Sequence, residues 1–383
     1  MSDRERVAIV GGGVIGCAVA RALAPDYDVT LFEKGQLAAE ATALAAGEIT
    51  MLSSYEDYPE IGWHAVEFFR EYDGTGSFSY TEVPSIGFVP SGRADEKRRY
   101  ARRLREDGIP ATYLDRETAS ERYPTFDFAG LDGVVEHEVS GFVDPYTFAI
   151  ELQNDARADG ATVHTETPVR ELVVDDGRVT GLETDAGSVD ADHVVVAAGW
   201  RTRRFLLEHA PVPVRPYRTQ CIVLEPREPL PDGFPMGWYP GEHVYFRAEH
   251  NGDLLVGGWS FAEDDPEGAS ADEDEAFRHH VADLVPTFLD GFEDAGYVNG
   301  WAGVDGATPD TRPIVDAPPD APDGLLVATG FNGRGVMTAP VAATAIRSLV
   351  AGEDAPFPME PFSIERFDTR SDDFEFISIS AGD

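Results

Sequence analysis

The sequence predicts an α/β protein in which a domain built on a parallel sheet is interleaved with an α+β domain that contains a large mixed sheet. Three observations support this fold class. A strand–turn–helix–strand pattern fills residues 6–33, several short strands fill residues 163–196, and a buried strand, a glycine-rich turn and a helix fill residues 325–350. Because related signals occur at the beginning, middle and end of the chain, we expect the domains to interleave.

The elements have distinct signatures in chain order. Residues 6–10 form a β-branched strand, residues 14–24 an apolar, alanine-rich helix, and residues 28–32 a second strand. Turn signals at Asp176-Gly177 and Ala186-Gly187 separate the strands in the middle of the chain. Helices are expected over residues 55–72, 95–107, 145–158 and 335–350, and after an acidic loop at 263–275. Strands are expected within residues 79–89, 163–196, 219–258 and 325–328.

The length and composition are those of a folded protein with one large domain or two ordinary ones. The chain has 383 residues, of which 42% are hydrophobic and 26% charged, and this excludes global disorder. The 70 Asp and Glu residues against 30 Lys and Arg residues give a formal net charge of −40. Such a surface repels phosphate backbones and anionic lipid, so nucleic acid and membrane surfaces are not expected partners.

The same charge favours a halophilic cytosolic protein, with an ordinary acidic cytosolic protein as the alternative. Lys34 and Lys97 are the only lysines. Molar salt shortens the Debye length to roughly 3 Å and removes most of the repulsion among the excess carboxylates. No run approaches the roughly 18 apolar residues of a membrane span, and the first apolar run lies inside a motif, so export is not expected. Cys17 and Cys221 form no CxxC motif, and no metal site is expected.

The glycine-rich turn of residues 11–16 predicts a dinucleotide-binding site of the Rossmann type. Gly11 allows the tight turn, Gly13 lets the backbone approach a pyrophosphate, and Gly16 permits close packing of helix and strand. The helix N-terminus offers free N–H groups to the phosphates. Glu33, at the end of the second strand, is placed to accept hydrogen bonds from a ribose and disfavours a 2′-phosphate, which makes NADP an improbable ligand.

Two further stretches favour FAD over NAD as the dinucleotide. Small residues are dense at 41–49, where backbone can lie against a flat ring system, and segments 197–200 and 329–335 repeat this character. Three such segments suit one extended cofactor. Spacing alone leaves NAD as the alternative.

The motifs together resemble the D-amino-acid oxidase-type (DAO) family of FAD-dependent amine and amino-acid oxidoreductases. The resemblance covers about residues 5–366, and its pieces occur in the family's order. They are VAIVGGGVIG (7–16), VTLFEK (29–34), ATALAAGEI (41–49), SGFVDPYTF (140–148), VVVAAGW (194–200), PVRPYRTQ (213–220), WAGVDGATPD (301–310) and LVATGFNGRGVMTAP (326–340).

The resemblance implies a set of cofactor-binding residues. Val14 and Ile15 would lie over the pyrophosphate, Glu33 and Lys34 would contact the adenosine, and the helix after Gly335 would point its N-terminus at the flavin. The remaining candidates are Ala41, Thr42, Ala46, Gly47, Glu48, Val169, Ala198, Gly199, Trp200, Gly330, Asn332, Gly333, Arg334, Val336 and Met337. Neither Cys nor His occurs in residues 38–50 or 301–310, where relatives attach flavin covalently, so non-covalent FAD is expected.

The implied reaction is oxidation of the C–N bond of an amine or α-amino acid by hydride transfer to flavin N5, giving an imine that hydrolyses. Sarcosine, dimethylglycine, proline and glycine are the expected kinds of substrate, with D-amino acids as the alternative. The electron acceptor is O2 or unknown, and the missing lysine after Lys97 weakly favours a dehydrogenase. Likeness of the 331–340 segment to β-type subunits of multimeric sarcosine oxidase and proline dehydrogenase leaves a homo-oligomer or a subunit of a heteromeric complex as alternatives.

Candidate substrate residues follow from the need to bind a carboxylate. Relatives use an arginine where this chain has Asp305, or a lysine where it has Met337, so Arg334 is the leading candidate. Tyr245 and Arg247 alternate with Phe246 on a strand and are expected on one wall of the site. Arg218 is a weaker candidate, and Asp305 is expected in a surface turn.

The family resemblance also suggests a discontinuous domain organisation. The FAD-binding domain is expected to comprise residues 1–50, 140–215 and 300–366, the substrate-binding domain residues 51–139 and 216–299, and a C-terminal tail residues 367–383.

Overall fold

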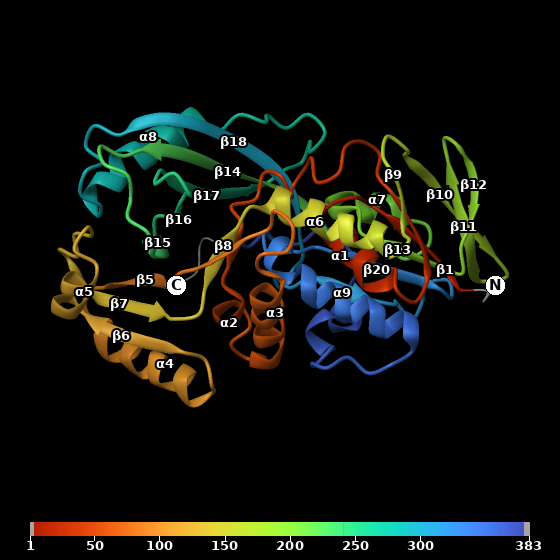
Figure 1. The fold of residues 1–383 in the computed structure, drawn as a ribbon, viewed down its shortest axis with the longest axis horizontal. Coiled ribbons are helices and arrows are strands. Elements are labelled where there is room, and N and C mark those ends of the chain that lie inside the picture. Colours follow the sequence, from red (N-terminus) through yellow and green to blue (C-terminus); the bar gives the residue numbers. More distant parts are fainter. Residues whose placement is uncertain (1–3, 240, 379–383) are drawn as a thin grey trace.

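The computed structural model describes residues 4–239 and 241–378, and its first layer is a six-stranded, mainly parallel sheet (Figure 1). Neighbouring strands run parallel, except that the edge strand β19 is antiparallel to β20. In sheet order the strands are β19 (Ile314–Asp316), β20 (Leu325–Thr329), β13 (His193–Val196), β1 (Arg6–Val10), β2 (Asp28–Phe32) and β9 (Thr162–His164).

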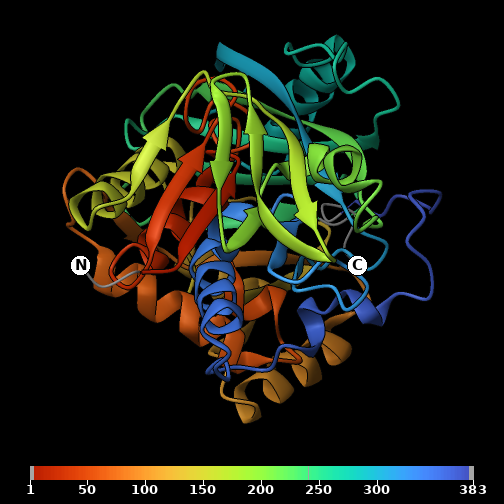
Figure 2. The same cartoon turned by 90° about the vertical axis from the view of Figure 1, so that its right-hand side faces the viewer.

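Alternate side chains of β1 enter two different cores, as expected for a strand buried on both faces. Val7 and Ile9 pack with helices α1 (Val14–Leu23), α6 (Pro145–Ala158) and α9 (Gly335–Ala351). Ala8 and Val10 pack instead against the antiparallel strands β10 (Val169–Asp175), β11 (Arg178–Thr184) and β12 (Gly187–Asp190), which cover the other face (Figure 2).

The second layer is an eight-stranded sheet of mixed direction, on the left in Figure 1. Phe88 and Phe246 of its strands form a separate core with Phe288, which lies in a turn outside the sheet. In sheet order the strands are β18 (Gly296–Ala307), β14 (Arg215–Glu225), β17 (Leu254–Ala262), β16 (Val244–Ala248), β15 (Met236–Tyr239), β5 (Ser85–Pro90), β7 (Leu131–His137) and β6 (Ala111–Asp115).

A small sheet and short helices join the two layers. The small sheet contains β3 (Glu48–Ile49), β8 (Gly141–Val143) and β4 (Tyr80–Glu82). The other helices are α2 (Met51–Ser54), α3 (Pro59–Tyr72), α4 (Ala94–Glu106), α5 (Arg116–Arg122), α7 (Thr202–Leu206) and α8 (Glu275–Leu284). Asp144 caps α6 by accepting from the Thr147 backbone N–H at 2.7 Å, and Pro145 begins that helix.

The mixed α/β fold class predicted from the sequence is confirmed, with local differences in the elements. Strands β6, β7 and β18 and the short helix α2 were not predicted, and the helix expected over 55–72 begins only at Pro59, whose ring suits the first turn of a helix. The second predicted turn lies at Asp185-Ala186 because Gly187 already begins β12. Phe69 of α3 packs in the same core as α1, so packing continues across the predicted domain boundary at residue 51. None of the helices in the described part of the chain is both long and apolar enough to span a membrane.

Candidate functional site

A cavity of about 860 Å³ extends between the two layers. At one end it is lined by the turn after β1 and by Glu33, Val169 and Phe205, and at the other by the inner face of the eight-stranded sheet. It therefore connects the predicted dinucleotide site with the predicted substrate domain.

The glycine turn at the first end needs glycine at two positions for steric reasons. Gly11 has φ +112°, and a Cβ there would lie 2.4 Å from the Ala197 carbonyl oxygen at the end of β13. A Cβ on Gly16 would lie 1.9 Å from the Gly11 carbonyl oxygen. Gly11 and Gly13 line the cavity, whereas Gly16 lies in α1 outside its lining. The backbone between them can therefore lie directly against a ligand.

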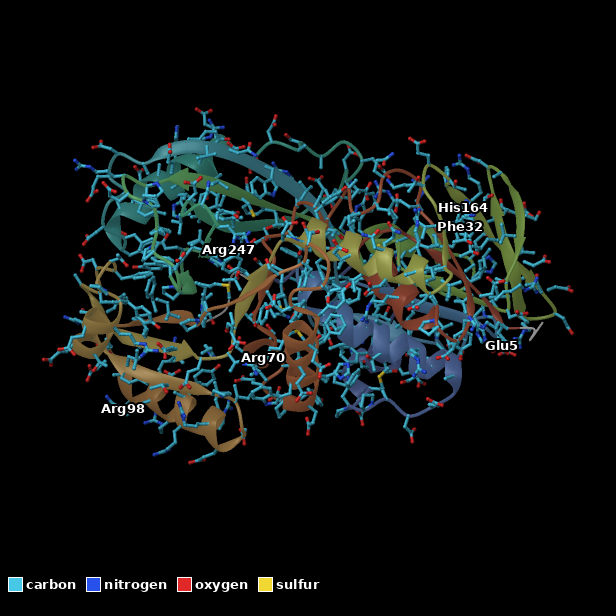
Figure 3. All side chains as sticks on the ribbon, viewed as in Figure 1. Glu5, Phe32, Arg70, Arg98, His164 and Arg247 are labelled. Carbon is cyan, nitrogen blue, oxygen red and sulfur yellow. The ribbon has the colours of Figure 1, made fainter. Side chains whose placement is uncertain are left out.

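Backbone N–H groups hold the acidic residue of this motif in place. The Glu33 carboxylate accepts from the N–H of Gly12 at 2.7 Å and of Gly35 at 2.8 Å, and the residue lines the cavity. Beside it, Phe32 of β2 and His164 of β9 stack with ring centroids 5.3 Å apart (Figure 3). The carboxylate keeps lone pairs for a ligand's hydroxyl groups.

The expectation of free N–H groups at the start of α1 needs one correction. The Thr42 hydroxyl oxygen accepts from the Val14 N–H at 3.0 Å, so that donor is already satisfied. This bond ties segment 41–49 to the glycine turn. Both Thr42 and Val14 remain in the cavity lining.

Most of the predicted cofactor residues line the cavity, and three do not. The lining includes Gly11, Gly13, Val14, Ile15, Glu33, Lys34, Ala41, Thr42, Ala46, Gly47, Glu48, Val169, Ala198, Gly199, Trp200, Gly333, Arg334, Gly335, Val336 and Met337. Gly16, Gly330 and Asn332 are absent from it. Asn332 has φ +51° and its side-chain oxygen accepts from the Thr308 N–H at 2.8 Å, so it shapes the loop before α9.

Side chains of the eight-stranded sheet anchor segment 41–49 from behind. Trp301 Nε1 donates to the Leu44 carbonyl at 2.9 Å, and Arg247 Nε donates to the Ala46 carbonyl at 2.5 Å. Arg247 also donates to the carbonyl of Ala248 and to Glu249, and its guanidinium lies 4.8 Å from the ring centroid of Phe142.

The structure does not place Arg247 on the predicted substrate wall. Its side chain, labelled in Figure 3, is buried against segment 41–49 and is absent from the cavity lining. Tyr245, in contrast, is part of the lining. Arg247 is therefore a positioning residue. Arg218 is also elsewhere, because it donates to the carbonyls of Ser270 and Asp272 and to Asp274 in the acidic loop.

Two carboxyl groups of the cavity differ in their surroundings. Asp305 lies in β18 rather than in the expected surface turn, and it accepts from the N–H of Gly306 at 2.7 Å and of Gly333 at 2.8 Å. Glu48 Oε1 is buried with no hydrogen-bond partner among the described residues. Burial raises the pKa of Glu48 to about 8, against the opposing effect of the Arg247 charge.

Arg334, which directly precedes α9, is one of the cationic residues that line the cavity. Its one hydrogen bond among the described residues runs from Nη1 to the Thr311 carbonyl at 3.2 Å, and burial lowers its pKa while the group stays cationic. Tyr217 lines the cavity nearby, with its hydroxyl 3.5 Å from Asp305, and Phe376 of the C-terminal tail stacks on it at 4.9 Å. The remaining guanidinium donors are available to an anion.

Sequence reasoning missed His137 and Trp238, which line the sheet end of the cavity. They come from β7 and β15, which lie on either side of β5 although they are about 100 residues apart in sequence. The only usable signal was a lone histidine in a β-favouring run, and this is too weak without the strand order.

The cavity fits an extended dinucleotide. The glycine turn and the small residues Ala41, Ala45, Ala46 and Gly47 line the cavity, and the first residues of α9, Gly335 to Met337, line it with N–H groups that have no acceptor within the helix. A helix N-terminus of this kind favours negative charge.

Comparisons with known proteins agree with this geometry. Residues 6–349 match the model of the DAO family, described as FAD dependent oxidoreductase. Glycine oxidase of Geobacillus kaustophilus is 28% identical over an alignment 388 positions long, which covers 96% of this chain and 98% of that protein. Its crystal structure superposes with a TM-score of 0.83 at 25% identity, covering 95% of this chain and all of that one. L-proline dehydrogenase from P. horikoshii shares the fold, with a TM-score of 0.87 at 20% identity over 96% and 99% of the two chains.

Proposed function

Because this chain belongs to the DAO family of FAD-dependent oxidoreductases, we propose that it oxidises the C–N bond of a small amine or α-amino acid to an imine, which then hydrolyses. Bound FAD would supply the hydride acceptor. The observation that carries the proposal is a single cavity lined both by the dinucleotide turn and by Arg334 and Tyr245. The names of the relatives, glycine oxidase and L-proline dehydrogenase, fit an amino-acid substrate.

The cofactor would be held by residues from both ends of the cavity. Gly11 and Gly13 would receive the pyrophosphate, Glu33 the ribose, segment 41–48 the ribityl chain and rings, and the start of α9 the flavin edge that becomes negative on reduction. Among the described residues that line the cavity there is no cysteine, and the single histidine, His137, lies at the sheet end. Both facts support non-covalent binding.

The substrate would be oriented by Arg334, whose unused donors suit a carboxylate. Tyr217 and Tyr245 would form the wall beside it. Segment 41–49, anchored from behind by Arg247 and Trp301, would keep the reacting carbon at a fixed distance from the cofactor, because a positioned substrate reacts far faster than a free one. Sarcosine, dimethylglycine, proline and glycine are the first candidates.

An anaerobic titration tests the proposal. The purified protein, saturated with FAD in molar salt, is mixed with sarcosine, dimethylglycine, L-proline, glycine and a set of D-amino acids while its visible spectrum is recorded. We expect one or more to bleach the flavin bands, and readmission of air then separates an oxidase from a dehydrogenase. Failure to bind FAD, or intact flavin bands with every amine in the presence and absence of candidate partner proteins, would refute it.

A further inference from the structure

A row of four rings lines the cavity along the inner face of the eight-stranded sheet, three of them from strands and one from a helix. Trp238 of β15 lies directly opposite Tyr245 of β16 in the strand register. The His137 ring lies 5.8 Å from that of Trp238, and Tyr100 of α4 approaches His137 at 6.5 Å with an edge-to-face angle of 69°. All four side chains line the cavity. We call Tyr245, Trp238, His137 and Tyr100 the ring row.

Glycines beneath the ring row let two of the rings lie flat on the sheet. A Cβ on Gly87 would lie 2.4 Å from the Trp238 ring, and one on Gly257 would lie 2.2 Å from the Tyr245 ring. Neither glycine has a positive φ, so the backbone does not require glycine at these positions. Because these two residues have no side chain, the Trp238 and Tyr245 rings can lie against the sheet. They therefore turn their faces toward the cavity and leave its space open.

The lining that α4, β5, β7 and β15 contribute at the ring row contains no carboxylate, lysine or arginine, and its polar groups are the hydroxyls of Ser85 and Tyr100, the Trp238 indole N–H and the His137 ring. The described residues of α4, β5, β7 and β15 that line it are Tyr100, Ser85, His137, Met236, Gly237 and Trp238. Burial lowers the pKa of His137 to about 4, so its ring is neutral near pH 7. His137 Nδ1 is buried and has no partner in the described part of the chain. Buried polar atoms of this kind are usually satisfied, in many cases by a ligand or water.

We propose that the ring row is a subsite for a flat aromatic group of the substrate, carried as its side chain or as its N-substituent, with a polar atom that hydrogen-bonds to His137. The proposal rests on the proposed function, because Arg334 must hold the carboxylate while the aromatic group lies along the row. Glycine or sarcosine would leave these ring faces uncovered. Pockets lined mainly by aromatic and apolar side chains with a few polar groups are typical of specific ligand sites.

Ligand binding to the FAD-loaded protein tests the subsite without turnover. Acetate, phenylacetate and 4-hydroxyphenylacetate are titrated while the visible flavin spectrum is followed. We expect phenylacetate to bind at least ten-fold more tightly than acetate, and the 4-hydroxyl group to add a further gain that His137→Phe removes. In the anaerobic titration, phenylalanine, tyrosine or N-benzylglycine should bleach the flavin at lower concentration than glycine or sarcosine.

Two variants and a control test whether the preference for phenylacetate over acetate arises at the ring row. Trp238→Leu removes a ring, and Gly87→Ala pushes that ring into the cavity, so each should reduce the acetate-to-phenylacetate Kd ratio at least five-fold. Trp259→Leu changes a tryptophan that contacts Phe277 and His280 outside the cavity lining and should leave the ratio unchanged. If Gly87→Ala does not fold, Trp238→Leu alone decides.

The outcomes separate this proposal from the proposed function. Equal affinity for acetate and phenylacetate, or equal losses for both ligands in Trp238→Leu, would overturn the subsite. Bleaching by small amino acids alone would overturn it too and would leave the proposed function intact. Absence of any spectral response to amines and carboxylates would overturn both.

Discussion

Glu48 and Asp305 are acidic residues of one cavity with opposite hydrogen-bonding situations. Asp305 accepts hydrogen bonds from the backbone N–H groups of Gly306 and Gly333 and thereby ties β18 to the loop before α9. Glu48 Oε1 has no partner among the described residues. Asp305 therefore stabilises the shape of the site, whereas Glu48 is a group inside the site that can bind or release a proton.

Glu48 makes a pH-dependent contribution to the stability of the apoprotein. Its pKa is about 8 in the folded state against 4.5 ordinarily, so between these values the unfolded chain ionises first and stability falls as pH rises. We expect Glu48→Gln to remove this penalty, so that its Tm advantage over the parent grows from pH 5 to pH 8. The exposed Glu228→Gln variant is the control. A constant difference across this range would contradict the pKa shift.

Arg334 should determine affinity for the carboxylate. Arg334→Gln is expected to weaken binding of acetate or an amino acid by roughly 1.5–3 kcal/mol, the usual contribution of a hydrogen bond to a charged group, while Arg334→Lys loses less. The measurement is Kd from the flavin spectrum. Arg312→Gln removes a neighbouring cation that pairs with Asp57 outside the cavity lining and should have little effect. An equal loss for an amine without a carboxylate would show that Arg334 does not act through that group.

Sequence alone predicted that Tyr245 and Arg247 share one face of a strand, but not which of them meets the cavity. That depends on segment 41–49, whose Ala46 carbonyl accepts from Arg247 Nε, while the other Arg247 donors bind the Ala248 carbonyl and Glu249. His137 was missed for a related reason. Its neighbours Ser85 and Trp238 reach it through pairing of β5 with β7 and of β5 with β15, and no local pattern encodes this order.

The elements were the most predictable level of the structure. The βαβ unit, α6 and α9 have strong periodicity and clear end signals, such as Asp144-Pro145 at the start of α6 and Gly352, with φ +64°, at the end of α9. The short helix α2 was missed, and the start of α3 was predicted four residues too early although Pro59 marks it. Strand β18 was missed because glycines interrupt its alternation of apolar and polar residues.

Gly16 tests how closely α1 must pack against the glycine turn. Because a Cβ at Gly16 would lie 1.9 Å from a backbone oxygen, Gly16→Ala must shift the helix or the turn. We expect a loss of about 1–3 kcal/mol of stability, as for other overpacked sites, together with weaker retention of FAD. Gly296→Ala, in which the nearest atom is the end of an exposed glutamate at 3.3 Å, is the matched control. Wild-type stability and FAD content in Gly16→Ala would contradict the packing argument.

At the scale of the whole molecule, the excess of acidic residues should appear as salt-dependent stability. The formal charge of −40 produces mutual repulsion that salt screens. We expect Tm to rise by about 5 °C or more between 0.1 and 2 M KCl, since each kcal/mol corresponds to roughly 2–4 °C in a large domain. A similar rise in isosmotic sucrose would assign the effect to solute exclusion instead. A flat or falling Tm in KCl would remove the physical basis for expecting a halophilic protein.

Because the chain has so few lysines, Lys34 can be labelled chemically as a reporter for the proposed cofactor site. Lys34 lies in the cavity lining, paired with Glu40, and Lys97 lies on α4, so the sequence offers only two side-chain amines. An acylating reagent followed by peptide mass spectrometry would therefore read occupancy of the cavity from the modification of a single residue. Protection of Lys34 relative to Lys97 on addition of FAD would map the adenosine end directly, with no mutation and no spectroscopic signal from the flavin.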